Sequence, residues 1–307
     1  MNEEKKDLVL YCCSFHRDVG RVVKLVESIK KYNSENIPVF ISCPKKDMNL
    51  FLSKVDSKVA SVLCEEEIIR NIPNATLEDV YSLKGGKLQQ QIIKSEFWRM
   101  GLAENTLVLD SDCQFLRPFS LSDFMVDSST PYSVIHEGRS FLRFTSRFGP
   151  ERARAEWHKD RRPIQLELKR PGLTYDYGYA PFIWSGKVWK SLYESHLLPR
   201  GENIIDAIKR HPSELTWYGE ALLKYRAIAI WPREELFRHY HYEHELWLDR
   251  RLGINQAQLA SDFLGVVRQS NWEHQLDHGR PSKSVASRLA RGMRRWAKWI
   301  RFRLDIL

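Results

Sequence analysis

The chain has 307 residues, of which 43% are hydrophobic and 28% are charged. This composition is ordinary for a globular protein and excludes intrinsic disorder, a collagen-like repeat and a small disulfide-rich scaffold. No run of about 18 uncharged apolar residues occurs, so we expect no membrane-spanning helix, and the acidic start of the sequence is not typical of a secretory signal peptide.

Apolar runs alternate with helical patterns over the first two thirds of the chain. Strands are predicted at Asp7–Cys13, Ile37–Cys43, Val59–Cys64 and Thr106–Leu109, and helices at Val19–Tyr32, Asp47–Val55 and Lys87–Arg99. This order predicts an α/β protein with a parallel sheet and helices on both of its faces. The ligands of such sheets bind at the carboxyl ends of the strands.

After residue 120 the pattern becomes less regular. Further strands are predicted at Tyr132–Ile135, Ala180–Ile183 and Ala227–Trp231, the last ended by Pro232, and a helix at Glu214–Tyr225 with Ser213 as its N-cap. The polar stretch 137–169 is expected to form one or two exposed helices. We predict one domain over residues 1–270, followed by a tail over 271–307.

The cysteines do not form a disulfide or zinc pattern. There are five of them, four in or beside predicted strands, and no two have the C-x-x-C spacing. Buried free thiols in a reducing cytoplasm explain this distribution best.

The sharpest motif is a pair of carboxylates directly after a predicted strand. Asp110-Ser111-Asp112 follows the apolar run Thr106–Leu109, which puts both carboxylates at the mouth of the ligand crevice. Residues i and i+2 of an extended segment point the same way, and two neighbouring carboxylates repel each other unless a cation joins them. A divalent metal ion would do so and would also hold substrate phosphates.

Two segments carry a resemblance to a known family. The stretch VLDSDCQFLRPF, residues 108–119, resembles the D-x-D segment of GT-A fold glycosyltransferases, and YSLKGGKLQQQIIKSEFWRMG, residues 81–101, is similar to the helix that precedes it in bacterial polysaccharide and lipopolysaccharide members. The resemblance implies a GT-A (Rossmann-like) mixed sheet flanked by helices. It also implies Mn²⁺ or Mg²⁺ held by Asp110 and Asp112 against the diphosphate of a nucleotide sugar, so that Asp110 also belongs to the donor site.

The start of the helix before this motif suits an anion. Lys84 and Lys87 flank Gly85-Gly86, and Gln90 lies about one helical turn further on. Glycine lets a ligand approach the backbone closely, and the amides of a helix N-terminus favour a diphosphate. An ordinary helix start with solvated lysines is the alternative.

Two further donor-binding candidates follow the first strand. The loop after that strand holds the nucleoside in the family that the chain resembles, which makes Ser14 and Arg17 candidates by position. A solvated loop explains them equally well.

Sugar transfer with inversion needs a general base for the acceptor hydroxyl. Glu214, at the start of a predicted helix, resembles the acidic residue that faces the acceptor in this family, and Glu220 and Asp176 are weaker candidates. An acidic residue that is favoured at this position only by the helix dipole is the alternative for Glu214.

Histidines gather after the last predicted strand of this region. His239 and His241 alternate along one face of an extended segment, so either is a candidate for completing the metal shell, and Arg238 is a candidate partner of the diphosphate. A surface histidine cluster unrelated to metal is the alternative.

The positive charge of the protein is concentrated at its end. The net charge is +9, and residues 281–307 contribute eight Lys and Arg against one Asp, so the rest of the chain is nearly neutral. At helical spacing the segment has an apolar face with tryptophans and a basic face, typical of a helix that lies on an anionic membrane. A helix packed on the domain is the alternative, and nucleic-acid binding is less favoured.

These observations favour a metal-dependent glycosyltransferase that uses a nucleotide-sugar donor. Its acceptor would be a glycan or a lipid-linked acceptor in the assembly of bacterial surface polysaccharide. We expect a cytoplasmic enzyme bound peripherally to the inner face of the cell membrane. A metal-dependent nucleotidyltransferase, and a non-enzymatic membrane- or RNA-binding protein acting through the tail, are the alternatives.

Overall fold

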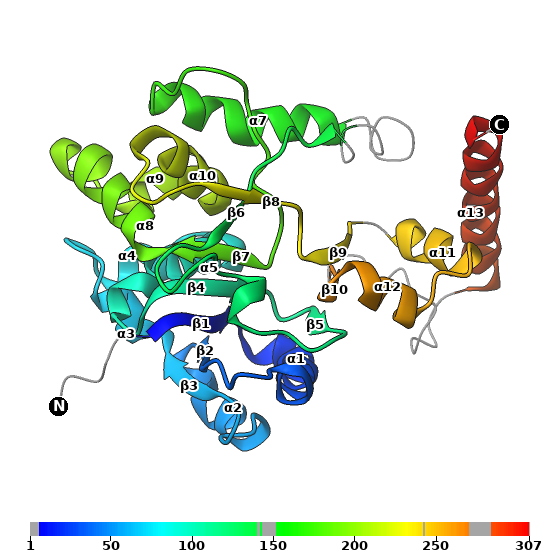
Figure 1. Ribbon diagram of the computed structural model, residues 1–307, viewed down its shortest axis with the longest axis horizontal. Coiled ribbons are helices and arrows are strands. Elements are labelled where there is room, and N and C mark those ends of the chain that lie inside the picture. Colours follow the sequence, from blue (N-terminus) through cyan, green and yellow to red (C-terminus); the bar gives the residue numbers. More distant parts are fainter. Residues whose placement is uncertain (1–5, 140–141, 143–151, 242, 270–283, 307) are drawn as a thin grey trace.

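A computed structural model describes residues 6–139, 142, 152–241, 243–269 and 284–306. Its centre is a five-stranded sheet in the order β3-β2-β1-β4-β7 (Figure 1). The strands are β1 (Lys6–Cys13), β2 (Val39–Cys43), β3 (Ser61–Cys64), β4 (Ala103–Leu109) and β7 (Phe182–Ser185). The first four run parallel and β7 is antiparallel to β4, which confirms the predicted mixed α/β fold with a Rossmann-like sheet.

Helices surround this sheet, and one of them stands apart from it. They are α1 (Val19–Tyr32), α2 (Met48–Lys54), α3 (Glu65–Arg70), α4 (Leu77–Tyr81), α5 (Gly86–Glu96), α7 (Arg152–Glu167), α8 (Gly186–Leu192), α9 (Ile204–Arg210), α10 (Glu214–Tyr225), α11 (Glu243–Arg251), α12 (Gln256–Asp262) and α13 (Val285–Ile306). Figure 1 shows α13 away from the sheet and beside α11. It falls within the predicted basic tail.

The core forms around β1, the middle strand of the sheet. Residues Leu8–Cys13 are all buried, as expected for an inner strand of a parallel sheet covered on both faces. β4 pairs with β1 up to the register Cys12–Leu109. Both strands therefore end at the same edge of the sheet.

A second, smaller sheet extends this edge. It has the order β5-β10-β9, from β5 (Cys113–Phe115), β10 (Gly265–Arg268) and β9 (Phe237–Tyr240). β10 is antiparallel to β5 and parallel to β9. A side chain at Gly265 would fall on the ring of Phe237, so glycine is needed there.

Two predictions about the later part of the chain are wrong. The strand expected at Ala227–Trp231 is instead β8 (Trp231–Arg233), which among the described residues pairs only with β6 (Tyr132–Val134), and Pro232 lies inside it. Proline is tolerated because this two-stranded ribbon leaves one side of β8 unpaired. In the polar stretch 137–169 the described helix is α7, and it buries Trp157 and Ile164, so it is not simply exposed.

All five cysteines are free thiols, four of them buried and Cys64 partly so, which agrees with the sequence prediction. Within the described part of the chain, no helix is long and apolar enough to cross a membrane.

Candidate active site

Asp110 and Asp112 form the turn between the two sheets. β4 leads directly into this turn, which is closed by a hydrogen bond from the Cys113 N–H to the Asp110 carbonyl (3.0 Å). The Arg268 N–H donates to the Asp112 carbonyl (3.3 Å) and so ties the turn to β10. Both carboxylates therefore lie at the carboxyl edge of the sheet, as the sequence predicted.

Lys94 on α5 reaches Asp110 from the interior. Its side chain is 4% exposed, and its ammonium group forms an ion pair with the Asp110 carboxylate. Burial alone would lower the pKa of Lys94, but the carboxylates of Asp110 and Glu214 outweigh burial and raise this pKa. Lys94 is therefore a fixed positive charge that two acidic groups share.

Glu214 is the first residue of α10 and is buried. Its helix begins at the N-cap Ser213, whose hydroxyl accepts a hydrogen bond from the Thr216 N–H (3.4 Å). Burial raises the pKa of Glu214, and the charge of Lys94 opposes part of that rise. The structure thus brings Glu214 into the electrostatic field of Lys94 and Asp110, although about 100 residues separate it from them in the sequence.

The predicted phosphate-binding helix start lies next to this group. Gly85 has a positive φ of 100° and is the N-cap of α5. Lys84 and Lys87 are exposed, and Lys87 is close enough to act on the charge of Glu214. The Gln90 amide donates to the Cys13 carbonyl (3.1 Å) at the end of β1, so Gln90 fastens α5 to the sheet.

The two donor-binding candidates in the loop after β1 lie in different environments. Ser14 is 4% exposed, and its hydroxyl has no hydrogen-bond partner among the described residues. Such a buried orphan is uncommon in native proteins. Arg17 is exposed in a short turn. Ser14 therefore keeps its place among the donor-site candidates on structural grounds, while Arg17 does so only by position.

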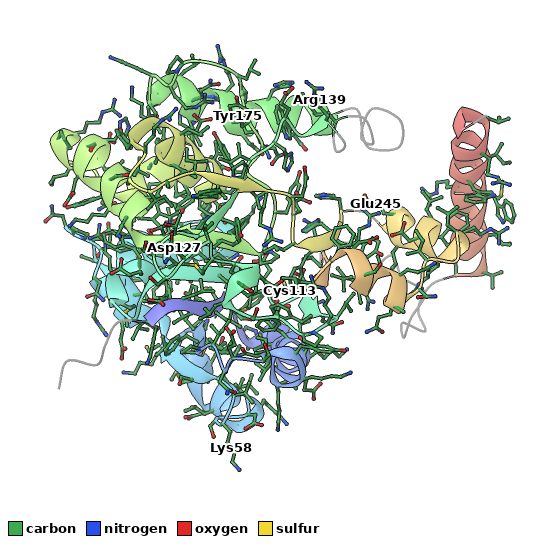
Figure 2. All side chains as sticks on the ribbon, viewed as in Figure 1. Lys58, Cys113, Asp127, Arg139, Tyr175 and Glu245 are labelled. Carbon is green, nitrogen blue, oxygen red and sulfur yellow. The ribbon has the colours of Figure 1, made fainter. Side chains whose placement is uncertain are left out.

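A cavity of about 940 Å³ opens beside the second sheet. Its walls come from the residues after β6, the turn 175–179, the segment 234–241, α11 and Phe263. Figure 2 labels Arg139, Tyr175 and Glu245, which stand on three different walls.

Arg238, His239 and His241 line this cavity. The rings of His239 and His241 lie 4.9 and 4.3 Å from that of Tyr179, measured between centroids, so the two histidines share one face as predicted. Burial lowers the pKa of His239 to about 3 and that of His241 to about 2, which leaves both neutral at pH 7. Arg238 forms an ion pair with Asp249 (3.2 Å).

The donor set at the turn suits a hard divalent cation. Within the described ranges, no three or more His, Cys, Asp or Glu side chains are grouped as a metal site. Mg²⁺ typically takes one or two carboxylates and completes its shell with water and substrate phosphates, and Asp110 and Asp112 can supply those carboxylates. The Nδ1 atom of His239 is buried and has no hydrogen-bond partner within the described chain, so His239 remains a predicted additional ligand.

The two weaker candidates for the base are held in closed networks. Asp176 is fully buried and accepts hydrogen bonds from Arg161 (2.9 Å) and from the Trp157 indole (2.7 Å). Glu220 is fully buried and accepts hydrogen bonds from Arg170 and from the Tyr177 hydroxyl (2.6 Å). Buried charges held in this way mainly stabilise the structure, so Glu214 remains the preferred base.

The sequence interpretation overlooked Lys94. A sequence pattern that indicates its position was nevertheless present. Lys87, Gln90 and Lys94 follow one another at spacings of three and four residues and so share one face of the helix. That face meets the ends of β1 and β4.

The chain belongs to a family of unknown function, DUF6492, whose sequence profile matches residues 5–251. A comparison with curated proteins finds no match. Among solved structures, the chain is similar to galactosyltransferase LgtC in complex with donor and acceptor sugar analogs, at 8% identity and a TM-score of 0.48. The match covers 84% of this chain and 86% of that one.

Proposed function

We propose that the protein is a glycosyltransferase that moves a sugar from a nucleotide-diphosphate sugar to a glycan or lipid-linked acceptor, in the assembly of bacterial surface polysaccharide. The observation that supports this most is the convergence of Asp110, Lys94 and Glu214 at the carboxyl edge of a Rossmann-like sheet. Asp112 stands two residues from Asp110 in the same turn.

The donor would bind across the turn and the start of α5. When bound by Asp110 and Asp112, Mn²⁺ or Mg²⁺ would neutralise the charge that develops on the diphosphate leaving group. The exposed Lys87 would add a positive charge at the helix start, where backbone amides favour an anion. Lys94 would hold the Asp110 carboxylate in place through their ion pair.

Glu214 would act as the general base. As the acceptor oxygen forms its bond to the anomeric carbon and the bond to the diphosphate breaks, the hydroxyl proton passes to the Glu214 carboxylate. The result is inversion at the anomeric carbon. Burial favours this role, because it makes the carboxylate a better proton acceptor than an exposed glutamate.

A thermal-shift panel of nucleotide sugars, with and without Mn²⁺, tests donor binding. We expect at least one nucleotide sugar to raise the melting temperature of the protein in a Mn²⁺-dependent way, and Asp112→Asn to abolish that shift. No shift with any donor would contradict the proposal. Release of pyrophosphate instead of a nucleoside diphosphate would identify a nucleotidyltransferase.

We further propose that α13 binds an anionic membrane surface at the inner face of the cell membrane. Its exposed apolar residues follow one another every three or four positions, namely Val285, Leu289, Met293, Trp296, Ile300 and Leu304. Another side of the helix rests on α11, where Trp299 meets Trp247 at 6.2 Å between ring centroids and Arg251 lies 5.8 Å from the centroid of the Trp299 ring. Each cation near an anionic leaflet contributes about 1 kcal/mol.

Sedimentation of the full-length protein with lipid vesicles tests this contact. We expect binding to phosphatidylglycerol vesicles that weakens with salt, and loss of binding in a variant with Leu289→Glu and Met293→Glu. Leu52→Glu is the matched control, since Leu52 is an exposed leucine on α2. Equal binding to neutral phosphatidylcholine, or binding of RNA without vesicles, would contradict the proposal.

A further inference from the structure

The cavity beside the second sheet has walls that are already in place. The His136 N–H donates to the Asp176 carbonyl (3.0 Å), and the Asp176 N–H donates to the His136 carbonyl (2.6 Å), so two neighbouring walls are joined. The buried Asp176 carboxylate also accepts from Arg161, Trp157 and the Gly178 N–H (3.1 Å). A preformed site of this kind loses little entropy when a ligand binds.

The charged groups on these walls give the cavity an acidic character. Four glutamates line it, Glu137, Glu234, Glu235 and Glu245, against the two arginines Arg139 and Arg238. Both arginines are engaged, Arg139 with Glu137 (2.8 Å) and Arg238 with Asp249 (3.2 Å), and one of the glutamates, Glu235, contacts His136 of the lining (3.5 Å). The balance of formal charge therefore opposes an anionic ligand.

The uncharged part of the lining is aromatic. Tyr179 packs against His239 and His241, and Tyr175 and Phe237 add further aromatic rings to the same two walls. Aromatic faces pack against the apolar faces of sugar rings, while carboxylates accept hydrogen bonds from their hydroxyls. The volume, near the top of the roughly 300–1,000 Å³ range of ligand sites, leaves room for more than one ring.

The register of the second sheet fixes the place of the cavity relative to the Asp110–Asp112 turn. Cys113, which follows this turn, pairs with Val267, and Val267 pairs with His239. Two strand spacings, roughly 10 Å, therefore separate the backbone after Asp112 from the wall that carries His239. A ligand in the cavity would lie beside a donor held at the turn and not in its place.

We propose that this cavity binds the acceptor through a neutral or amino-bearing sugar ring, and that its glutamates exclude uronic acids. This assignment rests on the proposed function only in naming the bound sugar as the acceptor. Sugar binding itself requires neither donor nor metal ion.

Saturation-transfer NMR of the full-length protein, without donor or metal, tests the assignment. The probes are methyl hexopyranosides of the gluco, galacto and manno series, each paired with its methyl hexuronide, which differs only by a carboxylate at C6. We expect transfer to at least one neutral glycoside and several-fold less to its uronide. Equal or greater transfer to the uronide, or no transfer to any neutral glycoside, would overturn the proposal.

Variants separate a binding role from a structural one. Tyr175→Ala should remove most of the signal, whereas Trp231→Ala should not, because Trp231 is exposed on β8 and does not line the cavity. A double variant with Glu234→Gln and Glu235→Gln should raise the uronide signal relative to the neutral glycoside, while Glu194→Gln on the surface leaves the ratio unchanged. An unchanged ratio in the double variant would refute the charge argument.

These readouts are independent of the donor experiment. If neutral glycosides bind as expected but no nucleotide sugar shifts the melting temperature, the proposed glycosyl transfer is contradicted, while the assignment of the cavity as a sugar-binding site is supported. If donors bind and turn over but Tyr175→Ala leaves both neutral-glycoside binding and acceptor KM unchanged, the cavity is not the acceptor site.

Discussion

The ammonium group of Lys94 forms an ion pair with the Asp110 carboxylate between α5 and the end of β4. This pair joins the helix that carries the phosphate-binding candidates to the turn that carries the metal-binding candidates. Lys94 also faces the charge of Glu214. A single buried cation therefore organises acidic groups from two distant parts of the sequence.

Replacing Lys94 by methionine should disable the site without removing the fold. The side chain keeps its apolar length, but Asp110 loses its ion pair, and Glu214 loses a positive charge that opposes the rise of its pKa. We expect donor turnover to fall by about 10²- to 10³-fold, measured as nucleoside diphosphate released. Lys190→Met, at an exposed lysine of α8, should change nothing, and wild-type turnover in the Lys94 variant would contradict this role.

Glu214→Gln should separate binding from chemistry. Glutamine keeps the shape of the side chain but accepts no proton, so we expect turnover to fall by about 10²- to 10⁴-fold while the donor-induced thermal shift remains. The matched control is Glu78→Gln, an exposed acidic residue in the first turn of α4. If Glu214 only complemented the helix dipole, both variants would lose a little stability and no activity.

The sequence predicted the turn better than its surroundings, for a physical reason. Asp110 and Asp112 are adjacent to an apolar strand, so local pattern and parallel-sheet topology were sufficient to place them. Glu214 was placed by resemblance, and its proximity to Lys94 depends on how α10 packs against α5, which no local pattern encodes. The cavity could not be predicted from the sequence, because its walls come from five separate segments.

Gly219 and Gly20 should respond oppositely to alanine. A Cβ at Gly219 would fall on the ring of Tyr177, whereas one at Gly20 meets nothing within 4 Å. Gly219→Ala should therefore destabilise the protein by about 1–3 kcal/mol through overpacking. Gly20→Ala should stabilise α1 by about 0.5–1 kcal/mol. Chemical denaturation measures both, and a neutral Gly219→Ala would contradict the packing described.

Glu167 should make stability depend on pH below neutrality. Burial alone would raise its pKa, but hydrogen bonds from Arg210 (2.6 Å) and His196 (3.0 Å) outweigh burial and lower this pKa to about 2. Because the folded pKa lies below the unfolded value of about 4.3, the stabilisation is present above that value and is lost as the pH falls towards 2.

The matching experiment compares Glu167→Gln with the wild type over this range. After allowance for solvent screening, the variant should be less stable by about 1–2 kcal/mol at pH 7, and the difference should shrink as the pH falls from 4.3 to 2. Glu194→Gln, in an exposed pair with Lys190 (3.8 Å), should show no such trend. A constant difference at all pH values would contradict the assignment.

The errors of prediction also have physical causes. Pro232 was taken as the end of a strand, but β8 pairs on one side only, so a residue without an N–H fits inside it. Lys94 was overlooked because a lysine in a helix usually lies in solvent, and only the tertiary contact with Asp110 explains its burial.

The central claim is that the Asp110–Asp112 turn supports transfer of a sugar from a nucleotide sugar. The most direct measurement is nucleoside diphosphate release from a panel of nucleotide sugars with Mn²⁺ and a neutral glycoside acceptor, for the wild type and Asp112→Asn. We predict release by the wild type that stops in excess chelator and is absent in the folded variant. Equal release by both proteins, or release that persists in chelator, would contradict the account.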